Sequence, residues 1–270
     1  MPSRFFSFFI FLYSLTINLQ PAYADEAANI KALEQTGCTA EILMEAESGD
    51  IIYEINSDKP LPPASMVKIM TTYITLQQVK SGDLKWDDIV TTSAFASKIG
   101  GSQVYLREKE QFTLRQMLDA VLIQSANDAA TAIAEHIAGS QEGFVELMNA
   151  EAARLGMKNT SFHSAHGLPP AKDQLPDLVS ARDMAILSRA LITDFPEVLE
   201  TTSKKEAGFR DGTFIMRNHN HLLHRFPGCD GIKTGYYAKA GFGVSTTALR
   251  KGGAANCRRN GMSKTRQARC

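Results

Sequence analysis

Three short groups of polar residues in this chain carry side chains typical of nucleophilic catalysis. Ser65 and Lys68 lie three residues apart, Ser125-Ala126-Asn127 follows in mid-chain, and Lys233-Thr234-Gly235 comes later. A serine hydroxyl is a weak nucleophile until a neighbouring base takes its proton. At this spacing on a helix, Ser65 and Lys68 lie one turn apart on the same face. The sequence therefore predicts a serine nucleophile served by a lysine base.

A lysine can act as a base only when burial or a nearby cation lowers its pKa. We predict that Lys233 is the cation that lowers the pKa of Lys68. Ser125 is expected to relay a proton to the leaving amine, and Asn127 to bind a peptide group of the substrate. The hydroxyl of Thr234 is expected to bind a terminal carboxylate.

An oxyanion hole is also expected near Ser65, because the start of a helix presents free backbone N–H groups. Gly235 has no side chain, so a substrate can lie against its strand. The N–H of Tyr236, the next residue, would then be the second donor of the oxyanion hole. S-x-x-K alone occurs by chance about once in a chain of this length. The three groups each occur once here, in this order, which makes the combination specific.

Hydrophobic spacing predicts the elements that position these groups. Apolar-rich runs at 40–44 and 51–55, joined by Glu47-Ser48-Gly49-Asp50, are typical of a β-hairpin. A helix is expected to begin after Pro62-Pro63 and to end at Ser81-Gly82.

Later elements complete the prediction. Thr113 and Gln116 form a capping box that indicates the start of another helix. Helices are expected over 128–138 and 140–155, and strands over 231–236 and 242–249. The order of strands, then helices, then strands favours an α+β fold, with an antiparallel sheet flanked by helices.

The first 24 residues have the pattern of a secretory signal peptide. Arg4 precedes an almost wholly apolar run over 5–19, and Ala22-Tyr23-Ala24 is a small-x-small cleavage site. The apolar run is too short for a membrane span, and no later stretch reaches the ~18 apolar residues that a span needs. We predict that residues 1–24 are removed and that residues 25–253 form one catalytic domain.

The composition is that of a globular protein, and its charge is unevenly distributed. The 270 residues include 29 basic and 29 acidic ones and are 44% hydrophobic. A neutral total argues against nucleic acid as a partner, because that requires a basic face. Residues 250–270 hold seven basic and no acidic residues, whereas residues 25–249 hold 21 basic and 29 acidic ones. Residues 254–270 are therefore an anomalous basic tail.

The three groups and their surroundings closely resemble the serine-type D-Ala-D-Ala carboxypeptidases of peptidase family S11, the low-molecular-mass penicillin-binding proteins of bacteria. The resemblance covers roughly residues 38–253. It rests on the motif regions 63–71, 125–130 and 230–236, and on Leu155-Gly156-Met157, His166-Gly167-Leu168 and Ser180-Ala181-Arg182-Asp183.

This resemblance implies a penicillin-binding protein/β-lactamase-like transpeptidase fold with an all-α subdomain. It also implies removal of the terminal D-Ala from peptidoglycan stem pentapeptides in the periplasm through an acyl-enzyme on Ser65. Lys68 would be the general base, Ser125 and Asn127 the second motif, and residues 233–235 the carboxylate-binding strand. β-Lactams would acylate the same serine, and no metal or organic cofactor is implied.

The tail departs from the family pattern. Members follow the strand matched by residues 242–249 with a further apolar strand, whereas residues 255–262 read Ala-Asn-Cys-Arg-Arg-Asn-Gly-Met. With a permissive choice of codons, a one-base shift there encodes Arg-Ile-Ala-Val-Val-Met-Gly. We therefore interpret residues 254–270 as the result of a reading-frame shift; a natural basic tail is the alternative. On this reading the last sheet strand is missing, the family's membrane-anchoring helix is absent, and the product is poorly folded or inactive.

Other interpretations remain open from the sequence. Five histidines could be metal ligands: His163, His166, His219, His221 and His224. The acidic partners that usually surround zinc ligands are missing near them. A class A β-lactamase needs Glu-x-x-x-Asn, which does not occur. A non-turnover peptidoglycan- or β-lactam-binding module on the same fold is a further alternative. Cys38 and Cys229 could form a disulfide.

Overall fold

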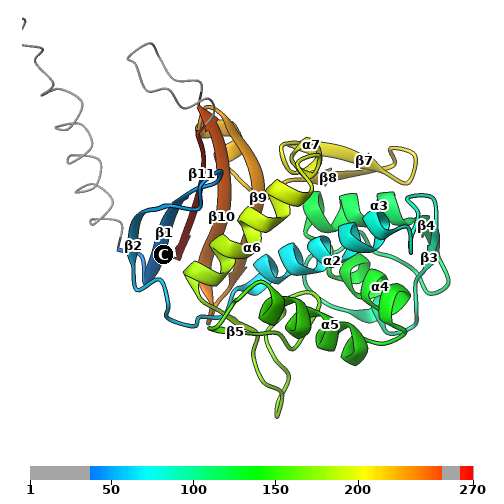
Figure 1. The fold of residues 1–270 in the computed structure, drawn as a ribbon. Coiled ribbons are helices and arrows are strands. Elements are labelled where there is room, and N and C mark those ends of the chain that lie inside the picture. Colours follow the sequence, from blue (N-terminus) through cyan, green and yellow to red (C-terminus); the bar gives the residue numbers. More distant parts are fainter. Residues whose placement is uncertain (1–36, 251–261, 270) are drawn as a thin grey trace, which may run out of the picture. The chain divides into compact units, whose positions relative to one another are not determined.

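The computed structural model describes residues 37–250 and 262–269 of the chain (Figure 1). The described residues from Cys38 onward lie in one compact unit. The predicted signal peptide lies outside the described residues. Within them, no helix is both long enough and apolar enough to cross a membrane.

A five-stranded antiparallel sheet forms one side of this unit. Its strand order is β2-β1-β11-β10-β9. The strands are β1 (Ala40–Glu45), β2 (Ile51–Ile55), β9 (Cys229–Tyr237), β10 (Gly241–Arg250) and β11 (Met262–Arg269). The predicted N-terminal hairpin and the two late strands are thereby confirmed. β9 lies at one edge of the sheet and pairs with β10. The pairing runs from Tyr237 with Gly241 to Gly231 with Thr247.

The structure contradicts the prediction that the last sheet strand is missing. β11 pairs with β1 on one side and with β10 on the other. The two neighbours present facing rows of backbone N–H and C=O groups, and any extended segment without proline can pair with them. The family's apolar sequence is therefore not required to fill the central position. The frame-shift hypothesis concerns residues 254–261 as well, which lie outside the described residues, and it stays a prediction.

Helices cover one face of the sheet and extend away from it (Figure 1). α6 packs against β1, β10 and β11, and α2 packs against α4, α5 and α6. Smaller two-stranded sheets, β3-β4, β5-β6 and β7-β8, lie outside the main sheet. The helices, including the 3₁₀ turns η1 and η2 and the π-helical turn η3, are η1 (Ala64–Val67), α2 (Lys68–Ser81), η2 (Ala96–Lys98), α3 (Leu114–Asp119), η3 (Ala120–Gln124), α4 (Asn127–Ala138), α5 (Gln141–Arg154), α6 (Ala181–Asp194), α7 (Val198–Thr202) and α8 (Leu222–Arg225). The short strands are β3 (Ile89–Thr91), β4 (Gln111–Thr113), β5 (Thr160–Ser161), β6 (Leu178–Val179), β7 (Glu206–Phe209) and β8 (Phe214–Arg217).

Local signals in the sequence set the helix ends. The capping box of Thr113 and Gln116 is present in full at the start of α3, and Ser140 caps α5 through the N–H of Gly143. Gly82 and Gly139 end α2 and α4 in the left-handed conformation that glycine adopts without strain. These ends agree with the predicted ones to within one or two residues.

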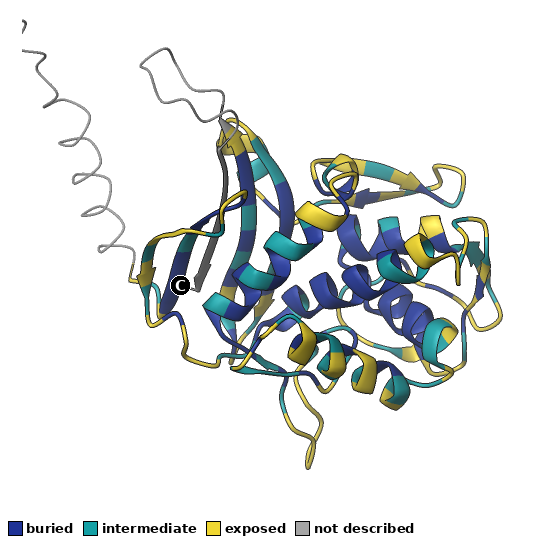
Figure 2. Ribbon diagram, viewed as in Figure 1, coloured by how far each residue is buried: buried dark blue, intermediate teal, exposed yellow. Residues whose placement is uncertain are grey.

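α2 is the central helix of the unit. Every residue from Lys68 to Leu76 is buried, so this part of the helix has no solvent-facing side (Figure 2). A helix that is buried all round is held by packing rather than by its own helix propensity. Lys68 is its first residue and Ser65 lies in the turn just before it, so this part of the predicted active site is anchored in the buried interior of the fold.

The disulfide that the sequence left open between Cys38 and Cys229 is not formed. Cys229 is a free cysteine at the start of β9, and its Sγ lies 3.2 Å from Oγ1 of Thr246. The neighbouring strand thus supplies a polar partner for the thiol.

Candidate active site

Ser65 lies in the 3₁₀ turn η1, immediately before α2. The turn follows Pro62-Pro63, and Ala64 has a left-handed backbone with φ of +50°. Ser65 is partly exposed, whereas its neighbours Ala64 and Met66 are buried. The turn therefore presents the hydroxyl of Ser65 to solvent while the residues on either side hold it in the core.

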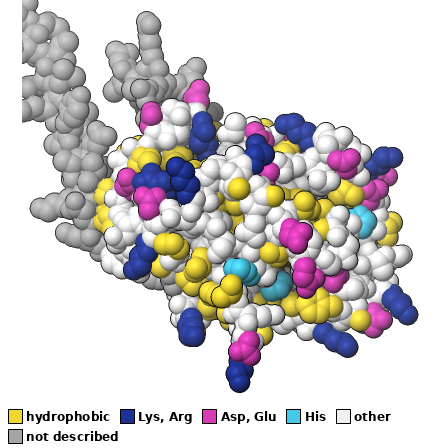
Figure 3. Space-filling view, turned by 60° about the horizontal axis from the view of Figure 1, so that its bottom comes forward, with side chains coloured by type: hydrophobic (Ala, Val, Ile, Leu, Met, Phe, Trp, Pro, Cys, Tyr) yellow, Lys and Arg dark blue, Asp and Glu magenta, His cyan; other side chains and the backbone are white. Residues whose placement is uncertain are grey.

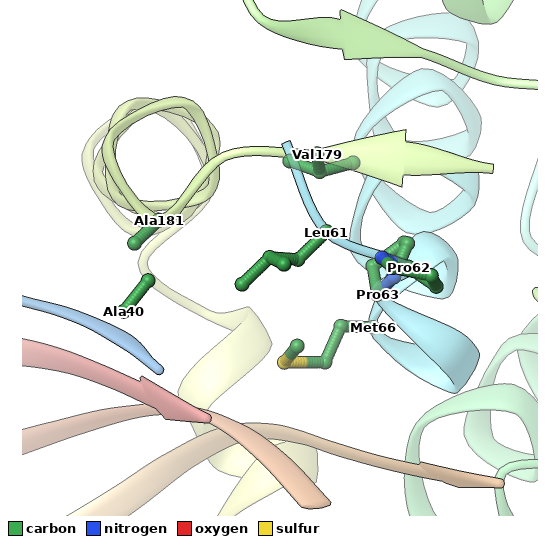
Figure 4. Close-up of a pocket in the computed structure, with 7 residues that line it drawn as sticks. All are labelled: Ala40, Leu61, Pro62, Pro63, Met66, Val179 and Ala181. Carbon is green, nitrogen blue, oxygen red and sulfur yellow. The ribbon is translucent and has the colours of Figure 1, made fainter. Parts of the chain in front are cut away.

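Met66 anchors this turn on the side of the sheet. It lines a small apolar cavity of about 20 Å³ together with Leu61 and Val179 (Figure 4). The Sδ–Cε end of Met66 also lies over Gly243 of β10, where an added Cβ would stand 2.5 Å from Cε. The nucleophile turn and the sheet are thus in direct contact across a glycine.

The side chain of Lys68 is fully buried beneath Ser65. Its Nζ lies 3.2 Å from Oγ of Ser65, 2.6 Å from Oδ1 of Asn127 and 2.6 Å from the carbonyl oxygen of His166. A neutral amine has two N–H groups and one lone pair. The amide and carbonyl oxygens can only accept, so they take both N–H groups and leave the lone pair to face Ser65.

The environment favours this neutral form. Burial lowers the pKa of Lys68 well below its ordinary value, and the charge of Lys233 lowers it further. Asp177 and Asp128 oppose this shift. Burial also lowers the pKa of Lys233, to about 7. This direction agrees with the predicted influence of Lys233 on Lys68, although burial is the larger cause.

Ser125 and Asn127 lie at the junction of η3 and α4. Ser125 has a left-handed backbone with φ of +61°, which ends the π-helical turn and directs the chain into α4. The Nδ2 of Asn127 donates to the carbonyl oxygen of Gly100, and its backbone N–H donates to that of Ser102. Asn127 therefore joins the loop around residue 100 to Lys68.

That loop is further fixed by a buried carboxylate that the sequence analysis missed. Asp128 accepts hydrogen bonds from the backbone N–H groups of Val104 and Leu106, and burial raises its pKa. The signal for such a role was weak, because an Asp in the first turn of a helix usually acts only on its own helix.

Lys233, Thr234 and Gly235 lie on the edge strand β9, beside η1. The Nζ of Lys233 is buried and donates to the carbonyl oxygen of Thr234 at 3.1 Å. Gly235 approaches the nucleophile turn so closely that an added Cβ would stand 2.5 Å from the carbonyl oxygen of Pro63 and 3.1 Å from the backbone nitrogen of Ser65. The backbone amides of Ser65 and of this strand are thus neighbours, as the predicted oxyanion hole requires.

The segment His166-Gly167-Leu168 closes the other side of the nucleophile turn. Any Cβ on Gly167 would collide with the carbonyl group of Ala64. Burial lowers the pKa of His166 to about 3, so its ring is neutral and Nδ1 accepts from the N–H of Leu168 at 3.1 Å. The carbonyl contact of His166 with Lys68 was not predicted, because a backbone acceptor leaves no trace in residue type.

A cleft of about 1120 Å³ opens over these groups. Its lining contains six of the predicted site residues, Ser65, Ser125, Asn127, Thr234, Gly235 and Tyr236, while Lys68 and Lys233 lie buried below. The structure therefore brings all eight predicted residues to one place.

Acidic and basic side chains are interspersed on the face shown in Figure 3.

Three histidines lie along the cleft. His219, His221 and His224 line it, but the described residues contain no group of three or more His, Cys, Asp or Glu side chains placed to hold a metal ion. Burial and the charge of Lys233 lower the pKa of His219.

A family model described as D-alanyl-D-alanine carboxypeptidase matches residues 26–256. The chain belongs to the D-alanyl-D-alanine carboxypeptidase family. It is 39% identical over 210 residues to the D-alanyl-D-alanine carboxypeptidase DacF of Bacillus subtilis, covering 77% of this chain and 53% of DacF. It is 38% identical over 249 residues to DacC of Escherichia coli, covering 90% of this chain and 59% of DacC. The chain thus spans just over half the length of these curated relatives.

Solved members of the family share its fold. Penicillin-binding protein 5 from Haemophilus influenzae matches with a TM-score of 0.77 at 32% identity, over 86% of this chain and 64% of that one. Penicillin-binding protein D2 from Listeria monocytogenes, in an ampicillin-bound form, matches with a TM-score of 0.74 at 32% identity, over 86% of this chain and 88% of that one. These neighbours establish the α+β transpeptidase fold that the family resemblance implied.

Proposed function

We propose that this member of the carboxypeptidase family is an active serine D-Ala-D-Ala carboxypeptidase that removes the terminal D-Ala of peptidoglycan stem pentapeptides. The observation that carries the proposal is the contact of 3.2 Å between Nζ of a buried Lys68 and Oγ of Ser65. Burial and the charge of Lys233 lower the pKa of Lys68 and so favour the neutral amine, whose lone pair would face the hydroxyl. A base of this kind is what a serine nucleophile needs.

The reaction follows from these positions. Oγ of Ser65 attacks the carbonyl carbon between the two D-alanines while Nζ of Lys68 takes the hydroxyl proton. The backbone N–H groups of Ser65 and Tyr236 stabilise the oxyanion. Ser125, which lines the cleft, passes a proton to the nitrogen of the leaving D-Ala. The resulting acyl-enzyme is then hydrolysed by water, with Lys68 again as the base.

The carboxylate of the substrate selects the cleavage position. Thr234 donates its hydroxyl to this carboxylate, and Lys233 supplies positive charge below it. Asn127 holds a peptide group on the opposite side of the cleft, where its amide lines the wall. We place this reaction in the periplasm, after export of the chain by residues 1–24.

β-Lactams are expected to acylate Ser65 and to leave it slowly. Among the residues that line the cleft in the described part of the chain, Glu206 is the one carboxylate, and it is paired with Arg217 at 3.2 Å. A carboxylate held in an ion pair is a poor general base for the water that would hydrolyse the acyl-enzyme. Efficient β-lactamase activity is therefore not expected.

The test is release of free D-Ala from N-acetyl-L-Lys-D-Ala-D-Ala by the purified chain. We expect one D-Ala per peptide and none with Ser65→Ala. Acylation of Ser65 by penicillin without any release of D-Ala from the peptide would favour the alternative, a β-lactam-binding member of the family that does not turn over.

A further inference from the structure

Asp177 is a buried carboxylate that belongs to none of the three motif groups. It directly precedes β6, and the pairing of Ser161 in β5 with Leu178 in β6 brings it beside the segment that follows β5. Its Oδ1 accepts from the backbone N–H groups of His163 at 2.6 Å and of Ser164 at 2.9 Å. Its Oδ2 accepts from the hydroxyl of Ser164 at 2.7 Å. Both carboxylate oxygens therefore bind donors of a single segment.

The same segment continues to the base of the candidate active site. The hydroxyl oxygen of Ser164, which donates to Asp177, also accepts from the backbone N–H of Gly167 at 2.9 Å. Between Ser164 and Gly167, the carbonyl oxygen of His166 accepts from Nζ of Lys68 at 2.6 Å. Asp177 is thus linked to Lys68 through a short stretch of backbone that it holds at one end.

The other side of this segment contacts α2 and the nucleophile turn. The carbonyl oxygen of Ala165 accepts from Oγ1 of Thr71 at 2.7 Å. Gly167 packs against the carbonyl group of Ala64 with no room for a Cβ. Without the carboxylate of Asp177, two backbone N–H groups and one hydroxyl would lose their acceptor, which favours a shift of the whole segment. A shift would change the contacts with α2 and with the turn that carries the nucleophile.

The charge of Asp177 also acts on Lys68. Charged and titratable groups from several elements interact with Lys68, and they are Lys233, Asp177, Asp128, His166 and His219. Burial and Lys233 lower the pKa of Lys68, whereas Asp177 and, to a smaller extent, Asp128 raise it. Burial raises the pKa of Asp177 itself, and its hydrogen bonds from residues 163–164 oppose that rise. Removal of the negative charge of Asp177 would therefore lower the pKa of Lys68 further.

We propose that Asp177 is a positioning residue that holds the carbonyl oxygen of His166 against Nζ of Lys68. With this acceptor in place, the lone pair of the neutral amine stays directed at Oγ of Ser65. If the carbonyl oxygen moves away, an N–H group of the amine loses its acceptor and turns toward Oγ instead. The inference rests on the proposed function, because it assigns Asp177 to the base of that reaction.

Two substitutions of Asp177 separate its geometry from its charge, with penicillin acylation followed by stopped flow across a range of pH. Asp177→Ala is expected to slow acylation by about 10- to 100-fold at pH values above the pKa of Lys68, because a displacement of about 1 Å has an effect of this size. Asp177→Asn keeps an oxygen for the two backbone N–H groups but removes the charge. It is expected to lose less rate and to move the rise of the rate with pH to lower pH.

A third variant and a matched control complete the set. Ser164→Ala breaks the link to Gly167 but leaves the charge of Asp177 in place. It is expected to slow acylation less than Asp177→Ala does and to leave the pH of the rise unchanged. Asp173→Asn is the control, because Asp173 is exposed in the loop that leads to Asp177. This control should match the natural chain in both rate and pH dependence.

Three results would overturn the inference. The first is a rise at the same pH in Asp177→Asn as in the natural chain, and the second is an unchanged rate in Ser164→Ala. The third is a lower Tm of Asp177→Ala with a natural rate per folded molecule, as a merely structural role predicts. If Asp177→Ala does not fold, the other two variants still decide. Release of D-Ala by the natural chain reports separately on the proposed function, because the inference is judged from the ratio of acylation rates between each variant and the natural chain.

Discussion

At the scale of single residues, the site depends on two lysines buried close together. Burying an ammonium group costs much more than burying an amine, and a second nearby cation increases that cost. Burial therefore lowers the pKa of both lysines, that of Lys233 to about 7. Their burial makes a base available to Ser65 and lowers the stability of the fold.

Lys233→Met tests this cost through stability. The folded-state pKa of Lys233 is about 7, against an ordinary 10.5. Below pH 7 the folded chain bears the full cost of the buried charge. As the pH rises from 7 to the ordinary value, folding releases a proton and the natural chain gains stability. We expect Lys233→Met to raise Tm by about 3 °C or more at pH 6, roughly 1 kcal/mol in a domain of this size.

The difference in Tm should shrink as the pH is raised toward 10, which differential scanning calorimetry can follow. A variant less stable than the natural chain at pH 6 would show that the charge of Lys233 is well compensated in the fold.

Lys68→Arg tests the base directly. Arginine keeps the positive charge but cannot give up its proton, so it cannot accept one from Ser65. Loss of general-base catalysis predicts penicillin acylation slower by about 10²- to 10⁴-fold. In the natural chain the rate of acylation by penicillin should increase as the pH rises through the pKa of Lys68. Because that pKa is lowered, the increase should occur well below pH 10.5. Lys158→Arg, on the exposed surface, is the control. Stopped-flow acylation kinetics in which Lys68→Arg matched the natural chain would exclude Lys68 as the base.

Residue types and spacing predicted the eight residues that the structure brings together, because six of them carry polar side chains in recognisable groups and Gly235 and Tyr236 directly follow Lys233-Thr234. The same reasoning could not find the carbonyl oxygen of His166 or the carboxylate of Asp128. The first is a backbone atom, and the second acts on the loop at Val104 and Leu106 from another part of the chain.

At the scale of elements, the site is a junction between the turn η1 and the strand β9. Its geometry depends on glycines where two backbones meet. Gly235 faces the backbone of Pro63 and Ser65, and neither can move aside as a flexible side chain would.

Gly235→Ala is therefore expected to displace the nucleophile turn. Its Cβ would stand 2.5 Å from the carbonyl oxygen of Pro63, and a shift of about 1 Å in a catalytic group can slow a reaction by ~10²-fold. We expect penicillin acylation to fall 10- to 100-fold while the chain stays folded by circular dichroism. Gly100→Ala is the control, because its Cβ would meet nothing within 4 Å. Equal losses in the two variants would argue against the packing explanation.

Thr265→Pro tests whether β11 is a structural strand. Thr265 pairs with Met44 of β1 in the middle of the sheet. Proline removes a backbone N–H and costs ~3 kcal/mol or more inside regular structure. We expect the variant to lose much of its thermal stability, whereas Thr265→Val, which keeps the N–H, should not. An unchanged melting curve for Thr265→Pro would mean that residues 262–269 do not complete the sheet in solution.

Periodicity predicted α2, α3, α4 and α5 and four strands of the sheet, because their apolar spacing and caps are local signals. It failed for β11, whose place depends on the unpaired edges of β1 and β10. Those edges lie far away in the sequence, so no local pattern in residues 262–269 reveals them.

At the scale of the whole molecule, the candidate site lies in a single cleft that is lined by residues from separate parts of the chain. On the face shown in Figure 3, acidic and basic side chains are interspersed, in agreement with the neutral composition. The sheet and the helices instead meet in one cleft, where three separate segments of the chain converge on Ser65.

The most direct test of this account is the intact mass of the chain after incubation with benzylpenicillin, with Ser65→Ala measured in parallel. We predict an increase of one drug mass on the natural chain and none on the variant. An adduct that persists in Ser65→Ala, or a folded natural chain that takes up no drug, would contradict the assignment of Ser65 as the nucleophile.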